Sequence, residues 1–238
     1  MGGWPGDGLA TAPRILWADD HLLAVDKPTG MPSVPARSRH DPPDVGALLA
    51  HVWGPLEAAH RLDRDTSGVL LLARSALARR RVGAAFEGRT VGKEYVAVVH
   101  GLPPTPVGTV HLPLAPDPDR APRQRVDPII GRPAITRWRT LARSADGTLT
   151  LLALEPVTGR SHQLRAHLAW LGTPIHGDAL YGAPPGSSGR MLLHAARIGF
   201  PHPLTGNRVD LLAPACFPPL GGGWRDVNRG VSGGAPSG

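Results

Sequence analysis

The sequence predicts an α+β fold. Short apolar runs with the alternation or the β-branched residues of strands recur along the chain, whereas only three segments have helical spacing. Strands and helices do not alternate regularly, which disfavours a doubly wound parallel sheet. Gly (30 residues) and Pro (27 residues) separate most of the apolar runs and predict many turns and loops.

The 238 residues suffice for one large domain or two small ones. No repeat or linker is evident within residues 14–220, so we expect one domain there. Residues 1–13 and 221–238 are rich in Gly, Pro and Ser and are predicted to be a disordered lead and a disordered tail.

In the first third of the chain we expect two short strands, a loop rich in Pro and Gly, a short helix, a polar segment and a buried strand. The helix should turn Leu48, Leu49 and Val52 inward. The corresponding ranges are 15–17, 22–25, 26–35, 44–53, 60–68 and 69–73.

In the remainder, Ser75 is a plausible N-cap for a helix through Phe86, and Gly88 should end it. Residues 115–133 form a predicted long loop with several Pro and Arg residues, which is typical of functional or disordered loops. We expect strands at 93–99, 108–114, 134–141, 149–154, 191–200 and 208–212, and a helix at 161–171.

The chain is strongly basic, with a formal net charge of +7. Nearly all of its cations are Arg, which suits phosphate binding and stacking on bases but equally fits a compositional bias of the genome. The positive charge favours an anionic partner such as RNA. One Cys excludes an internal disulfide and a Cys-based zinc site, and we expect no membrane span and a cytoplasmic protein.

The segment from His60 to Gly68 concentrates two carboxylates, two guanidiniums, a His and two hydroxyls immediately before a buried strand. Such a segment is costly to bury, so we interpret it as a site at the mouth of a cleft. His162 and His167 are five residues apart, which argues against a zinc-binding His pair. One ionised Asp acting as nucleophile remains as a candidate. A glycosidase that uses Asp63 and Asp65 stays open on the pattern alone.

Five motifs, in order, resemble the RluA family of RNA pseudouridine synthases. The central one is His60–Arg61–Leu62–Asp63 with Thr66–Ser67–Gly68. The others are Asp26–Lys27–Pro28–Thr29–Gly30 with Val34–Pro35, Lys93–Glu94–Tyr95, the segment 158–167, and Leu192–Leu193–His194–Ala195 with His202–Pro203.

This resemblance implies a mixed, largely antiparallel sheet with flanking helices and loops around a central cleft. It also implies that uridine in RNA is isomerised to pseudouridine without a cofactor or a metal. Asp63 would be the catalytic carboxylate, Arg165 its partner, and Tyr95 the ring that stacks on the base, while Arg61 would enter the space that the flipped uridine leaves. We expect further RNA contacts from Arg64, Lys27, His60, Arg160 and His162.

Structural roles compete with several of these assignments. Lys27 could pair with Asp26 instead of RNA, His60 and His162 could orient loops, and Tyr181 could be part of the core or of the cleft wall. A non-catalytic RNA-binding protein on the same scaffold is the alternative function.

The chain resembles the short form of the family, without an S4 domain, and its middle segment is most similar to the dual-substrate branch. That branch acts on a tRNA anticodon stem-loop and a large-subunit rRNA loop. We therefore expect RNA as partner, no protein partner and a monomer. The segment 115–133 is the expected reader of RNA shape.

Overall fold

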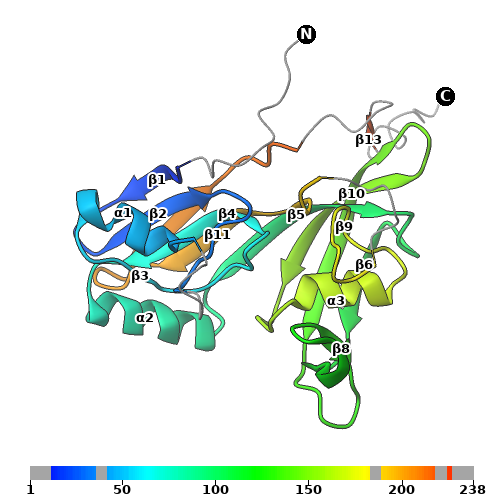
Figure 1. Cartoon of the computed structure of the whole chain (residues 1–238), viewed down its shortest axis with the longest axis horizontal. Coiled ribbons are helices and arrows are strands. Elements are labelled where there is room, and N and C mark those ends of the chain that lie inside the picture. The colour runs from blue at the N-terminus through cyan, green and yellow to red at the C-terminus, as the bar shows by residue number, and fades with distance from the viewer. Residues whose placement is uncertain (1–11, 36–41, 183–188, 218–223, 227–238) are drawn as a thin grey trace, which may run out of the picture.

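The computed structural model describes residues 12–35, 42–182, 189–217 and 224–226 (Figure 1). Within these residues, eleven strands form one sheet whose main path runs β1–β2–β4–β11–β5–β10–β9–β13, with β3, β6 and β12 paired at its sides. The strands of this sheet are β1 (Arg14–Ala18), β2 (Leu22–Lys27), β3 (Glu57–Ala58), β4 (Ser67–Ala73), β5 (Gly92–His100), β6 (Val107–His111), β9 (Ile135–Ser144), β10 (Leu149–Pro156), β11 (Leu193–Pro201), β12 (Arg208–Leu212) and β13 (Trp224–Asp226).

The predicted α+β class and the mixed, largely antiparallel sheet are confirmed. Among the described strands only the β4–β11 pair is parallel. The helices are α1 (Val45–Trp53), α2 (Ala76–Glu87) and α3 (Gln163–Trp170). Asp44 caps α1 and Ser75 caps α2, each with a side-chain oxygen that accepts a backbone N–H of the first turn.

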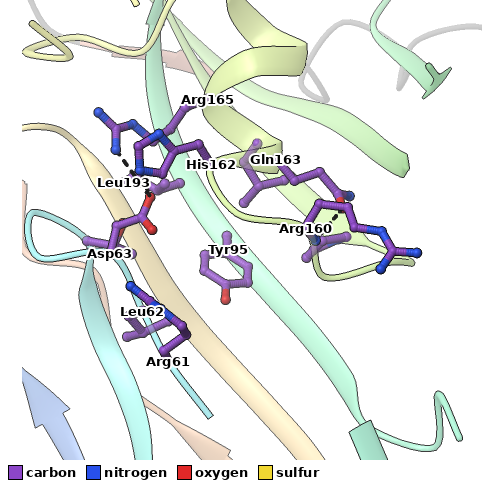
Figure 2. A pocket seen from close by; sticks show the side chains of 12 residues that line it. Arg61, Leu62, Asp63, Tyr95, Arg160, His162, Gln163, Arg165 and Leu193 are labelled. Carbon is purple, nitrogen blue, oxygen red and sulfur yellow. Dashed lines mark hydrogen bonds and ion pairs between the residues drawn. The ribbon is translucent and has the colours of Figure 1, made fainter. Parts of the chain in front are cut away.

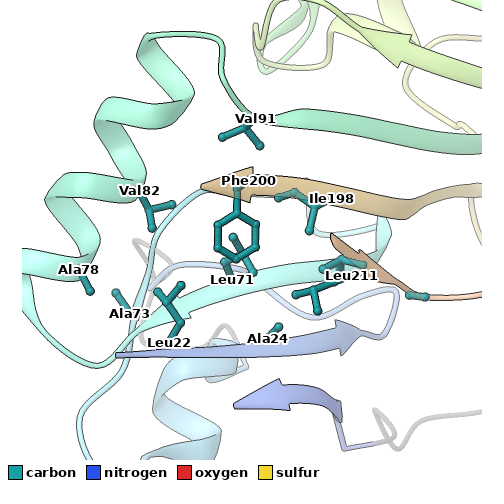
Figure 3. Close-up of a cluster of buried hydrophobic side chains, with 12 residues drawn as sticks. Leu22, Ala24, Leu71, Ala73, Ala78, Val82, Val91, Ile198, Phe200 and Leu211 are labelled. Atoms are coloured by element: carbon teal, nitrogen blue, oxygen red, sulfur yellow. The ribbon is translucent and has the colours of Figure 1, made fainter. Parts of the chain in front are cut away.

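Strand β4 is buried along its whole length and divides two apolar clusters. Val69, Leu71 and Ala73 pack into one cluster with Phe200 of β11 and Val82 of α2 (Figure 3). The alternate residues of β4 pack into a second cluster beside α1. Because successive side chains of a strand point to opposite faces, one apolar run can supply both clusters.

A third cluster lies between α3 and the strands β5, β9 and β10, with Leu164 and Leu168 as the contribution of the helix. Tyr95 of β5 packs against this cluster and also against the one beside α1. Strand β5 thus joins two halves of the molecule, one with α1 and α2 and the other with α3 (Figure 1).

The predicted loop 115–133 contains regular structure. Strands β7 (Leu114–Pro116) and β8 (Gln124–Val126) pair as a small separate sheet, with a 3₁₀ turn, η1 (Pro118–Arg120), between them. The strand expected at 108–114 is accordingly divided into β6 and β7, interrupted at Pro113.

Three further differences are local. The helix expected from residue 161 begins at Gln163, because His162 has a left-handed φ of 51°. Val52 is 67 % exposed and does not turn inward. Residues 224–226, in the segment predicted to be disordered, pair with β9 as β13. Residues 1–11, 221–223 and 227–238 of the predicted lead and tail lie outside the described residues.

No helix among the described residues has both the length and the apolar character required to cross a membrane.

Candidate active site

Asp63 lies at a pocket of about 90 Å³ between the two halves of the molecule (Figure 2). Four segments contribute its walls: the loop before β4, strand β5, the turn between β10 and α3 with the first turn of that helix, and the start of β11. The pocket is lined by Arg61, Leu62, Asp63, Thr66, Tyr95, Pro156, Arg160, His162, Gln163, Leu164, Arg165 and Leu193. Of the predicted site residues, Asp63, Arg165, Tyr95, Arg61, Arg160 and His162 are thus brought together.

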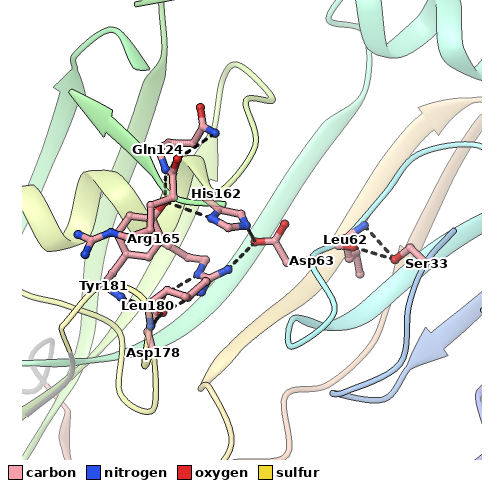
Figure 4. A network of polar contacts seen from close by, with 10 residues as sticks. Ser33, Leu62, Asp63, Gln124, His162, Arg165, Asp178, Leu180 and Tyr181 are labelled. Carbon is pink, nitrogen blue, oxygen red and sulfur yellow. Dashed lines mark hydrogen bonds and ion pairs between the residues drawn. The ribbon is translucent and has the colours of Figure 1, made fainter. Parts of the chain in front are cut away.

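The Asp63 carboxylate is oriented by Arg165 (Figure 4). A guanidinium nitrogen of Arg165 donates a 3.2 Å hydrogen bond to Oδ2 of Asp63. The same guanidinium donates two further bonds, of 2.7 and 2.8 Å, to both oxygens of Asp178. Arg165 is 4 % exposed and the Asp178 side chain is fully buried. Burial opposes the charge on Arg165, but the hydrogen bonds and charges of Asp178 and Asp63 prevail and raise the pKa of Arg165.

Tyr95 projects from β5 into the pocket beside Asp63 (Figure 2). Burial and the nearby Asp63 charge raise the pKa of the Tyr95 hydroxyl, so the ring remains a neutral phenol. A neutral ring on a rigid strand can offer a flat face to a planar ligand. Strand β5 holds it through antiparallel pairing of Tyr95 with Leu154 on one side and Ala195 on the other.

The loop that carries Asp63 is fastened to the first motif. The Ser33 hydroxyl donates to the Leu62 carbonyl at 2.9 Å and accepts from the Leu62 N–H at 3.1 Å (Figure 4). The Thr29 hydroxyl donates to the Asp65 carbonyl, and Arg64 donates to the Gly30 carbonyl. The segment after β2 therefore serves as a clamp for the site loop.

Lys27 belongs to this clamp and does not contact solvent. It is 0 % exposed, and its Nζ donates to the carbonyl oxygens of Pro28, Met31 and Arg64 at 2.8–2.9 Å. Burial lowers its pKa to about 8, although Asp65 and Asp63 act in the opposite direction. These three bonds use all three of its ammonium protons, which favours a structural role of Lys27 over the predicted RNA contact. The alternative pairing with Asp26 is not observed either, since Asp26 pairs with Arg14.

His60 is also structural. Its Nε2 accepts the Leu71 N–H of β4 at 3.1 Å, and its ring lies 4.9 Å from that of Phe86. Burial and the charge of Lys93 lower its pKa to about 3, so the ring is neutral. His60 does not line the pocket of Asp63, and these contacts favour the loop-orienting role over the predicted RNA contact.

His162 lies between Asp63 and Tyr181. Its Nε2 is 3.9 Å from Oδ2 of Asp63, and its Nδ1 is 3.1 Å from the Tyr181 hydroxyl. Burial lowers the pKa of His162, although the charge of Asp63 acts against that effect. Tyr181 is 6 % exposed and its hydroxyl also accepts the Gln124 N–H of β8. The hairpin β7–β8 is thereby joined to the pocket through Tyr181 and His162.

Arg61, Arg64 and Arg160 occupy more open positions. Arg61 and Arg64 are exposed, Arg61 at the pocket and Arg64 two residues beyond Leu62. Arg160 is partly buried and donates to the Pro133 carbonyl. The guanidiniums of Arg61 and Arg160 give the pocket a positive charge.

Sequence reasoning assigned no role to Ser33 or Asp178 and described Tyr181 only as core or wall. Each acts through a partner that is 13 or more residues away in the chain, and no local spacing reveals such a pair. For Asp178 and Tyr181, the one signal in the sequence was that they lie close together in the short segment after residue 176. Among the described residues, no group of three or more His, Cys, Asp or Glu side chains is arranged to hold a metal ion.

Comparison of the sequence with known proteins shows which family the chain belongs to. Residues 21–170 match the family model for RNA pseudouridylate synthase. The chain is 40 % identical over 205 residues to the dual-specificity RNA pseudouridine synthase RluA of Escherichia coli strain K12, covering 85 % of this chain and 93 % of that protein. The corresponding protein of Haemophilus influenzae is 39 % identical over the same shares.

Solved structures agree. Human RNA pseudouridylate synthase domain containing 1 superposes with a TM-score of 0.73 at 26 % identity, covering 87 % of this chain and 85 % of that one. Human RNA pseudouridylate synthase domain containing 4 gives 0.69 at 26 % identity, covering 85 % and 88 %. The chain belongs to the RluA family of RNA pseudouridine synthases, enzymes that isomerise uridine in RNA.

Proposed function

We propose that this chain forms pseudouridine at the pocket of Asp63, with Asp63 as the catalytic carboxylate. The observation that carries the proposal is that, among the described residues, Asp63 is the one carboxylate lining the pocket and is held 3.2 Å from the buried Arg165 guanidinium. The N1–C1′ bond breaks, the base rotates and C5 joins C1′; the C5 hydrogen leaves as a proton and N1 takes up a proton. A carboxylate can serve this reaction by attacking C1′ or C6, or by taking a proton from C2′.

The neighbouring residues have matching tasks. The neutral Tyr95 ring stacks on the uracil that enters the pocket. Removing that base from its stack costs a few kcal/mol, and a base in a loop is cheaper to open than one in a duplex. Arg61, exposed at the pocket, offsets the cost by entering the space left in the RNA.

The proposed substrates are a tRNA anticodon stem-loop and a large-subunit rRNA loop, bound by a monomer. The name of the E. coli relative, a dual-specificity RNA pseudouridine synthase, supports more than one RNA. The hairpin β7–β8 and the turn after it expose basic side chains, and Ile129 and Ile130 of the turn are 90 % and 68 % exposed. Such a protruding basic hairpin suits recognition of RNA by shape.

A glycosidase has less support. Hydrolysis of a glycosidic bond uses two carboxylates that face the same bond. Asp65, the second candidate, is exposed and does not line the pocket of Asp63. A binding protein without activity also has less support, because Asp63, Tyr95 and Arg165 are all present at one pocket.

The test is carbodiimide mapping of pseudouridine in total RNA from cells with the gene, without it, and with Asp63→Asn in its place. A site lost in the deletion identifies the substrate, and Asp63→Asn should fail to restore it while the purified variant still binds the RNA. Asp65→Asn is the matched control and should restore the site. Restoration by Asp63→Asn would contradict the proposed role of Asp63, and loss of sites in rRNA alone would contradict the tRNA part of the proposal.

A further inference from the structure

A second pocket opens beside the one at Asp63. It has a volume of about 370 Å³ and lies between the end of α2, the start of β5 and the turn after β10. Three cations line it: Arg89, Lys93 and Arg160, against one carboxylate, Glu87. Arg160 lines both pockets, so the two lie on either side of one side chain or share it.

Lys93 is the distinctive cation of this second pocket. Its Nζ lies 5.9 Å from the centre of the Phe86 ring and faces Gly159, where an added Cβ would come within 3.8 Å of it. Within the described part of the chain this Nζ donates no hydrogen bond and forms no ion pair. Burial lowers the pKa of Lys93, and the Phe86 ring is the one protein group that the described structure places against the charge.

The rarity of lysine in this chain also distinguishes Lys93. Only two of the 26 basic residues of the chain are Lys. Lys27, the other one, satisfies three carbonyl oxygens, whereas Lys93 satisfies none in the described structure. An ammonium is a compact point charge that fits where a planar guanidinium does not, and phosphate is a common ligand for it.

The position of Lys93 relative to Tyr95 indicates which phosphate. The two residues are two apart on β5, so their side chains share a face of the strand and their Cα atoms are about 6–7 Å apart. A uridine stacked on Tyr95 would place the backbone of an adjacent nucleotide over Lys93. We propose that the pocket of Lys93, Arg89 and Arg160 binds one backbone phosphate of the RNA beside the target uridine, an inference that rests on the proposed function.

The experiment uses the full chain and a synthetic anticodon stem-loop RNA that carries tritium at C5 of its uridines, because pseudouridine formation releases that hydrogen. Lys93→Gln should raise Kd and KM about tenfold and leave kcat unchanged, because a charge-assisted bond to phosphate is lost. The slope of log Kd against log salt should fall by about 0.7, the value for one phosphate of a single strand. Lys93→Arg should restore part of the affinity.

Arg139→Gln is the matched control. Arg139 is exposed and pairs with Ala153, while the neighbouring Leu154 pairs with Tyr95, so Arg139 projects from the opposite face of the sheet. Its removal deletes the same charge and should change neither Kd nor the salt slope. Thermal unfolding of each variant verifies that it is folded.

A second arm locates the phosphate. Methylphosphonate replaces the loop phosphates one at a time, which removes one charge at each linkage. At one linkage, the methylphosphonate should weaken binding of the wild-type protein as much as Lys93→Gln weakens binding of unmodified RNA. The same methylphosphonate should not weaken binding of the Lys93→Gln variant any further. Equal Kd and salt slopes for wild type and Lys93→Gln, or additive losses at every linkage, would overturn the phosphate pocket. If wild type binds this RNA and releases no tritium, the proposed function fails for this RNA, while the Kd comparison still decides the pocket.

Discussion

At the residue scale, the site depends on a guanidinium shared by two carboxylates. Asp178 holds Arg165 with two hydrogen bonds, and Arg165 then orients Asp63. Asp178→Asn should lower the free energy of unfolding by about 3 kcal/mol, because it leaves a buried charge poorly compensated. It should lower kcat as well, since Arg165 loses its fixed position. Urea unfolding and single-turnover assays measure the two effects.

The matched control for that change is Asp210→Asn. Asp210 pairs with Arg197 and Arg208, but all three side chains are substantially exposed. Exposed ion pairs contribute little to stability, so this variant should unfold nearly as wild type does. Equal stability of the two Asn variants would show that Asp178 is not required to compensate Arg165.

His60 gives a prediction about pH at the same scale. Burial lowers its pKa to about 3, whereas an unfolded His has a pKa near 6.5. Between these values the unfolded chain binds the additional proton, so stability falls as the pH falls below 6.5. Between pH 7 and pH 5 this one residue should account for up to about 2 kcal/mol of lost stability. His60→Gln, which retains an acceptor for the Leu71 N–H, should lose correspondingly less over that interval in urea titrations. A loss as large as that of wild type would contradict a neutral, partly buried His60.

At the element scale, the hairpin β7–β8 is coupled to α3 through one hydroxyl. The Tyr181 hydroxyl accepts the Gln124 N–H at 2.7 Å and is 3.1 Å from Nδ1 of His162. Tyr181→Phe keeps the ring but deletes both contacts. We expect about 1 kcal/mol less stability and a larger loss in kcat than in KM, because His162 loses its orientation beside Asp63. Steady-state kinetics with RNA measure this division.

Thr105→Val is a suitable control for the hairpin variant, since it deletes an exposed hydroxyl that bonds only to the Val107 carbonyl in the described structure. It should leave both kinetic constants unchanged. If Tyr181→Phe raised KM alone, Tyr181 would contribute to RNA binding without orienting the pocket.

Elements were predictable to the extent that their signals were local. The Ser75 cap, the alternating strand at 93–99 and the apolar run at 69–73 all correspond to observed elements. The hairpin β7–β8 was missed because its three-residue strands lie among prolines and show no alternation. The start of α3 was placed too early because nothing in the sequence marks the left-handed backbone of His162.

At the scale of the whole molecule, the site exists only because distant segments meet. The motifs led to Asp63, Tyr95 and Arg165, which line one pocket. The motifs did not show what holds them, because Asp63 and Arg165 are 102 residues apart and the clamp of Ser33 on Leu62 spans 29. Such pairings follow from topology, above all from the parallel junction of β4 with β11. That junction connects the loop of Asp63 to the half of the sheet that α3 covers (Figure 1).

Gly68 sits at this junction, opposite Ala195, with a left-handed φ of 112°. A Cβ added there would overlap the carbonyl oxygen and the nitrogen of Ala195, so the two strands would have to separate. Gly68→Ala should therefore lower the free energy of unfolding by about 3 kcal/mol and reduce kcat, because Asp63 and Arg165 approach from opposite sides of the junction. Gly83→Ala is the control: it lies within α2, an added Cβ meets nothing within 4 Å, and helix propensity should raise stability by up to about 1 kcal/mol. Urea unfolding and tritium release measure both variants. If Gly68→Ala were destabilised but kept the kcat of wild type, the pocket would tolerate separation of the two strands. The position of Asp63 would then be set by the clamp of Lys27 and Ser33 and not by the sheet.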